Sequence, residues 1–188
     1  LSMGSGTVFS LQYGAGDLSA LRRSIYVSFL LIGTVTILLN VAVFLWLDPI
    51  LRWLQVPYDI YSLMRNYLWI IFWGIVFTFL YNFYAALLRA VGDSVTPLWF
   101  LAVSVVLNIG LDLFLILVLD QGIEGAAVAT VIAQGTAASG ILLYTYKIRP
   151  ELRLHREDMR FDRSSLREIT SFSTLTCVQQ SVMNFGIL

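Results

Sequence analysis

The sequence predicts an all-α, polytopic membrane protein, and three observations lead to that fold class. First, 58% of the 188 residues are hydrophobic and 13% are charged, with a mean hydropathy of +0.78, which is outside ordinary soluble usage. Second, the charged residues collect in short connectors. Third, the stretches between these connectors are apolar runs of about 20 residues, the length that a helix needs to cross a bilayer.

Four apolar runs are long enough to be complete spans. They cover residues 24–47, 67–88, 98–119 and 125–146. The stretch 1–13 has the composition of the end of an earlier span, and 169–188 that of the beginning of a later one. Both ends of the chain are therefore expected to lie inside a larger protein.

The connectors between the runs carry turn and helix-start signals. Residues 14–17 and 92–94 contain glycine next to aspartate, and Pro97 stands in the first turn of the third run. Residues 120–122 form a very short connector. The third and fourth spans are therefore predicted to be adjacent and antiparallel.

Lysine and arginine are distributed unequally between the two sides of the predicted membrane. Connectors 14–23, 89–97 and 147–167 hold ten of them, and connectors 48–66 and 120–124 hold two. By the positive-inside rule the first set is cytoplasmic. The 147–167 stretch also contains nearly as many acids as bases, so we expect a solvated linker there and no nucleic-acid partner.

Asp112 is the one charged residue inside a predicted span. A charged carboxylate near mid-membrane costs roughly 2.5–3.5 kcal/mol on insertion scales, so Asp112 should face the bundle interior or water. Desolvation favours the protonated form of a carboxyl group, which suits a site that takes up and releases a proton or cation. The alternative is a carboxylic acid that holds helices together by hydrogen bonding.

Polar residues follow one face of three predicted spans. Ser104, Asn108 and Asp112 are four residues apart and share a helix face. The neighbouring spans carry Gly74, Thr78 and Asn82, with Tyr67 one or two turns earlier, and Ala126, Thr130, Gln134 and Ala138. Such stripes can be ordinary interhelical contacts, but together with a lone carboxylate they indicate a proton or cation relay. A separate ridge of small residues, Gly125, Ala129, Ala133 and Ala137, predicts close helix packing.

Several kinds of chemistry find no motif in the sequence. There is no phosphate-binding G-x-x-x-x-G-K-[ST] loop, no nucleophile elbow and no H-E-x-x-H motif. One cysteine, Cys177, and one histidine, His155, exclude a disulfide framework and a histidine metal cluster. We expect no enzyme activity, no cofactor and no metal, except a Na⁺ ion that could bind near Asp112.

The sequence resembles the multidrug and toxic compound extrusion (MATE) family, in its DinF-like branch. The most specific part is the connector R-x-x-G-D-S-x-T-P at residues 89–97, followed by N-x-x-x-D at Asn108 and Asp112. The other similar stretches are residues 3–6, 12–15, 81–88 and 122–130.

The resemblance implies a fold of twelve helices in two lobes around a central cavity. On that template residues 1–146 are most of the N-lobe, from the end of helix 2 through helix 6. Residues 147–167 are the cytoplasmic linker between the lobes, and 168–188 are the start of helix 7 in the C-lobe.

The resemblance also implies roles for the polar residues. Asp112 and Asn108 would belong to a network that couples transport to H⁺ or Na⁺, with Thr130, Asn82 and Tyr67 completing its surroundings. Cavity-lining positions would be Ser104, Thr78, Gln134, Gln180 and Asn184.

The function implied is multidrug efflux by a multi-pass antiporter in the plasma (inner) membrane of a prokaryote. It would act by alternating access on amphipathic, often cationic organic compounds, as a full-length monomer in the lipid bilayer. Two alternatives stay open: a flippase for lipid-linked precursors in the same superfamily, and a non-transporting membrane scaffold. A flippase would be expected to carry cationic residues in its cavity, and none is visible in the sequence.

Overall fold

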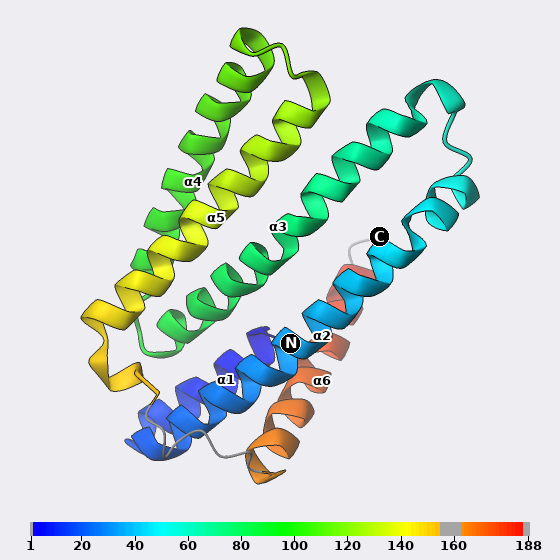
Figure 1. The fold of residues 1–188 in the computed structure, drawn as a ribbon. Helices are drawn as coiled ribbons and strands as arrows, with labels where there is room; N and C mark the ends of the chain where they lie inside the picture. Colours follow the sequence, from blue (N-terminus) through cyan, green and yellow to red (C-terminus); the bar gives the residue numbers. More distant parts are fainter. Residues whose placement is uncertain (1, 155–162, 186–188) are drawn as a thin grey trace. The chain divides into compact units, whose positions relative to one another are not determined.

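The computed structural model describes residues 2–154 and 163–185, and all of their regular structure is helical, which confirms the predicted class (Figure 1). The elements are α1 (Ser2–Gly14), α2 (Leu18–Trp53), α3 (Tyr58–Ala90), α4 (Val95–Leu113) with the π-helix η1 (Phe114–Val118), α5 (Gly122–Ile148), the 3₁₀ turn η2 (Pro150–Leu152) and α6 (Arg163–Phe185). Within the described residues, four helices are long and apolar enough to cross a membrane: α2, α3, α4 with η1, and α5.

The helices extend beyond the predicted apolar runs because polar residues cap and continue them. α2, for example, begins six residues before the run at 24–47. Asp17 caps it by accepting hydrogen bonds from the Ala20 backbone N–H at 2.9 Å and the Ser19 hydroxyl at 2.8 Å. These two bonds, the backbone one first, lower the pKa of the Asp17 carboxyl.

The predicted linker 147–167 is shorter than expected at both ends. Its first two residues complete α5, and α6 begins at Arg163 rather than at 168. The centre of the linker, residues 155–162, and with it His155, lies outside the described residues. The predicted turns are confirmed, with Gly16 at φ 75° and Gly92 at φ 87°, a conformation that glycine adopts without strain.

The chain divides into two compact units, each of which receives segments of the four long helices. Unit 1 comprises Leu1–Thr34, Asn82–Pro97 and Ile141–Leu188. Its core includes Val8, Val27 and Ile169, which are fully buried and come from α1, α2 and α6. The Phe83 ring of α3 makes edge contacts with Phe9 at 6.1 Å and Phe29 at 5.3 Å between ring centroids.

Unit 2 comprises Val35–Tyr81 and Leu98–Gly140. Within it α4 and α5 lie side by side and antiparallel, as the short connector predicts (Figure 1). The ridge of small residues is buried, with Ala129 at 0% and Ala133 at 2% exposure. A Cβ atom built on Gly125 would lie 3.1 Å from the Leu115 Cβ, so the ridge is a close-packing face.

Candidate functional site

The polar face of α4 contacts α5 in unit 2 through two successive hydrogen bonds. The buried Ser104 hydroxyl donates to the Ala133 carbonyl oxygen at 2.9 Å. One turn further along α4, the Asn108 amide nitrogen donates to the Thr130 hydroxyl oxygen at 3.4 Å. The Thr130 hydroxyl in turn donates to the Ala126 carbonyl oxygen at 2.9 Å. The stripes predicted on these two helices therefore do face each other.

Asp112 stands one turn beyond Asn108, on the same stripe. Its side chain is half-buried, and its Oδ1 atom is fully buried without a hydrogen-bond partner among the described residues. The neutral polar groups before it on α4 are satisfied, whereas this carboxylate oxygen is not. Two residues later the chain enters the π-helix η1, a type of irregularity that is frequent at functional sites.

A second polar contact joins α3 to α5. The Thr78 hydroxyl lies 2.9 Å from the Gln134 Oε1 and 3.1 Å from the Gly74 carbonyl oxygen, two acceptors for its one proton. Gly74 permits this approach, because a Cβ atom there would stand 2.9 Å from the same Gln134 Oε1. Three predicted residues, Gly74, Thr78 and Gln134, thus lie together.

The other predicted residues are not joined to this group. Tyr67 is half-buried on α3 and makes no hydrogen bond to the α4–α5 polar residues within the described part of the chain. Asn82 and Gln180 belong to unit 1, and both are exposed. Asn184 lies on α6, but its side chain is outside the described residues. Their grouping with Asp112 stays a prediction.

Comparison with known proteins places the chain in a family. The family model MatE matches residues 1–114, more than half of the chain. The chain belongs to the MatE family. It is 40% identical over 141 residues to the "Probable multidrug resistance protein YpnP" of Bacillus subtilis, covering 75% of this chain and 32% of that protein. It is 32% identical over 171 residues to the "Probable multidrug resistance protein YoeA" of the same organism, covering 89% of this chain and 35% of that protein.

A solved MATE structure in the bent conformation shares the fold. It superposes on this MatE chain with a TM-score of 0.89 at 20% sequence identity, over 99% of this chain and 42% of the solved one. The chain thus spans about a third to two-fifths of the length of the curated relatives and solved structures it matches.

The structure adds polar residues to this MatE unit that the sequence did not single out. Asn40, inside the first apolar run, donates from its side-chain amide to the Phe72 carbonyl oxygen at 2.7 Å and so links α2 to α3. Asn66 donates to the Glu124 carboxylate at 2.9 Å and links α3 to the first turn of α5. The signal for Asn40 was available, because an amide within an apolar span needs a partner.

The conserved-looking turn between α3 and α4 organises a separate charge cluster in unit 1. Asp93 accepts hydrogen bonds from the Thr96 backbone N–H at 3.1 Å and the Thr96 hydroxyl at 2.8 Å. Its carboxylate lies 3.8 Å from the Arg149 guanidinium and 3.4 Å from the Tyr144 hydroxyl. Desolvation opposes ionisation, but the Thr96 hydrogen bonds, the Arg149 charge and Tyr144 outweigh it and lower the pKa of Asp93. The turn is therefore a structural anchor for the end of α5.

Proposed function

We propose that this chain belongs to a secondary active transporter that exports amphipathic, often cationic organic compounds in exchange for H⁺ or Na⁺. Membership of the MatE family and the multidrug-resistance names of its relatives support the transport class. The transporter would lie in the plasma (inner) membrane of a prokaryote and act as a monomer. The end of α5 would face the cytoplasm, because the connectors on that side hold most of the lysines and arginines.

The observation that carries the coupling role is the buried, unpartnered Oδ1 atom of Asp112. A buried charged group without a partner is costly, so the carboxyl is stable there only when it holds a proton or contacts a cation. No ion pair reaches Asp112 among the described residues. A proton or Na⁺ would therefore change the free energy of Asp112 in its present environment by several kcal/mol on the order of burial costs.

Asn108 and Thr130 support this role by supplying oxygen atoms on the same stripe. Asn108 uses its amide nitrogen toward Thr130, which leaves its carbonyl oxygen as an acceptor. Hard cations prefer carboxylate, carbonyl and hydroxyl oxygens, so these residues suit Na⁺ as well as a relayed proton. Tyr67 and Asn82 are proposed as outer members of the network. Thr78, Gln134 and Ser104, with Gln180 and Asn184, are proposed to line the transport cavity.

The coupling role would work through alternating access. Neutralising Asp112 removes the cost of burying its charge, and ionising it favours an arrangement in which water reaches the carboxylate. The bound ion thus shifts the equilibrium between two conformations by its differential affinity for them. Export would follow when the same conformational change releases the organic substrate on the other side.

The test replaces Asp112 with asparagine in the full chain and measures efflux of a fluorescent cation from vesicles under an imposed H⁺ or Na⁺ gradient. We expect Asp112→Asn to reduce gradient-driven efflux to the level of vesicles without protein, with membrane insertion and abundance unchanged. Asp120→Asn is the matched control, because Asp120 is an exposed acid at the end of the same span. Gradient-driven efflux by Asp112→Asn equal to that of the control would overturn the coupling role.

A further inference from the structure

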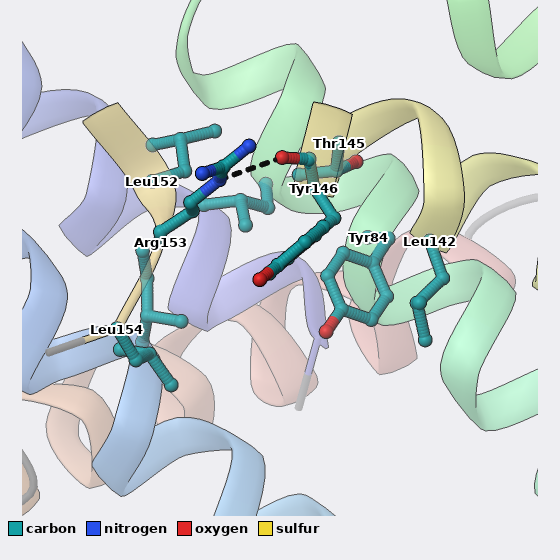
Figure 2. Close-up of a pocket in the computed structure, with 9 residues that line it drawn as sticks. Tyr84, Leu142, Thr145, Tyr146, Leu152, Arg153 and Leu154 are labelled. Carbon is teal, nitrogen blue, oxygen red and sulfur yellow. Dashed lines mark hydrogen bonds between the residues drawn. The ribbon is translucent and has the colours of Figure 1, made fainter. Parts of the chain in front are cut away.

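A pocket of about 220 Å³ opens in unit 1, where α2, α3 and α5 carry their end with many cations (Figure 2). It is formed by the start of α2, the end of α3, the last turns of α5 and residues 152–154. The pocket contains none of the residues assigned to ion coupling. Its volume is also below the roughly 300–1,000 Å³ that is usual for sites of drug-sized molecules.

The inner wall of the pocket is apolar. Ile25, Leu87 and Leu152 are 4%, 1% and 5% exposed, and Leu142 lies beside them in the lining. A wall of this kind at the end of membrane-spanning helices suits a hydrocarbon segment, because it offers contacts to methylene groups and no unsatisfied polar group.

The rim of the pocket holds one fixed cation. The Arg153 Nε donates to the Tyr146 carbonyl oxygen at 2.8 Å, and the guanidinium carbon lies 4.4 Å from the centre of the Tyr146 ring (Figure 2). Both contacts hold the guanidinium in position while its terminal nitrogens keep their N–H donors. Arg149 has carboxylates within 4.0 Å, but Arg153 makes no ion pair among the described residues.

The surroundings of the rim add positive charge without adding counter-charges to Arg153. Lys147 and Arg89 are exposed at the ends of α5 and α3 in the same unit and likewise make no ion pair among the described residues. This is the end predicted to face the cytoplasm, whose leaflet carries the anionic lipids. Tyr146, 60% exposed, has the amphipathic ring that is frequent at the membrane–water interface.

We propose that this pocket binds an anionic phospholipid. The phosphate accepts hydrogen bonds from the terminal nitrogens of Arg153, and the upper part of one acyl chain lies against Leu142, Leu87 and Leu152. The rest of the lipid stays in the bilayer, which explains why a pocket of this size is sufficient. A cationic export substrate does not fit this position, because Arg153 would repel it.

The test compares lipid binding by the full chain in neutral detergent, with native mass spectrometry as the readout. The probes are phosphatidylglycerol and phosphatidylcholine with the same acyl chains. We expect the wild type to retain phosphatidylglycerol more strongly, and Arg153→Gln to lower its affinity about five-fold without affecting phosphatidylcholine. Lys147→Gln is the matched control, since it removes a cation from the same helix end outside the pocket lining and should change the affinity less.

A second variant, Leu142→Trp, fills the apolar part and leaves Arg153 in place. We expect it to lower phosphatidylglycerol retention as well, while its thermal unfolding in lipid-free detergent shows that it is folded. Three results would overturn the proposal: equal retention of the two lipids by the wild type, equal effects of Arg153→Gln and Lys147→Gln, or unchanged retention in a folded Leu142→Trp. Competition by glycerol 3-phosphate at the same concentration would assign the site to a free phosphate instead and overturn it too. Because binding is measured without transport, the result is independent of the coupling role of Asp112.

Discussion

Two threonines of α5 differ in a way that isolates the contact between α4 and α5. Thr130 and Thr136 each donate a hydrogen bond to the carbonyl oxygen four residues earlier, at 2.9 Å in both cases. Only Thr130 also accepts one from Asn108, at 3.4 Å. Their substitution by valine, which has almost the same shape, therefore removes the same local bond in both cases but the interhelical one only at Thr130.

We predict that Thr130→Val weakens ion-dependent efflux, because the Asn108 amide loses its partner and Asn108 no longer has a fixed orientation beside Asp112. A single neutral hydrogen bond contributes about 0.5–1.5 kcal/mol, so we expect a shift of roughly two- to ten-fold in the ion concentration that gives half-maximal efflux. Thr136→Val should leave that concentration unchanged. Equal values for the two variants would contradict the assignment of Thr130 to the network.

At the scale of elements, α1 and α6 approach each other more closely than a side chain on α1 would allow. A Cβ atom added to Gly4 would lie 2.4 Å from the Ser173 Cα and 2.7 Å from its backbone nitrogen. Because these are backbone atoms, the two helices would have to move apart. Gly110 of α4 is the opposite case, since nothing lies within 4 Å of the corresponding position.

We predict that Gly4→Ala destabilises the protein by roughly 1–3 kcal/mol, as overpacking usually does. Gly110→Ala should instead be neutral or stabilise by about 0.5–1 kcal/mol, because alanine restricts the unfolded chain and favours a helix. Thermal unfolding of both variants in detergent, followed by circular dichroism, measures the difference. A Gly4→Ala variant as stable as Gly110→Ala would show that α1 and α6 are not in close contact.

At the scale of the whole molecule, the orientation in the membrane depends on the sum of many charges. The connectors that contain the α3–α4 turn and the end of α5 hold ten lysines and arginines, against two on the other side. The arrangement of helices around the four spans gives alternate ends to the two sides, so one orientation accounts for all connectors.

We predict that Gln121 in the α4–α5 connector faces the outside and that Ser94 in the α3–α4 connector faces the cytoplasm. Both are exposed, and Cys177 is the one cysteine of the sequence, so single-cysteine variants can be made in a Cys177→Ser background. A membrane-impermeant maleimide added to intact cells should label Gln121→Cys, and Ser94→Cys only after permeabilisation. The reverse pattern would contradict the predicted orientation and the cytoplasmic position of the linker.

Most of the fold could be predicted because the spans depend on local composition. The apolar runs, the glycine turns and Pro97 locate four helices, and the short connector at 120–122 makes α4 and α5 neighbours. The ends were less accurate, as at α6, which begins at Arg163, because polar residues continue a helix wherever caps allow it. The candidate site was predicted in part. Asp112, Asn108 and Thr130 follow from spacing on a helix face, whereas the bond from Asn40 to Phe72 depends on which helix lies opposite.

By itself, the sequence determined that this is a membrane protein of the MatE type with one carboxylate inside its spans. The physical reason is that a bilayer penalises charge and unpaired backbone groups, so every crossing segment must be apolar and helical, and an exception such as Asp112 is conspicuous. Only the tertiary structure decided which polar residues meet. It brings Asn108 to Thr130 and Thr78 to Gln134, leaves the Asp112 Oδ1 atom without a partner, and fixes Arg153 over Tyr146. These contacts depend on the rotation and packing of neighbouring helices, which no local pattern specifies.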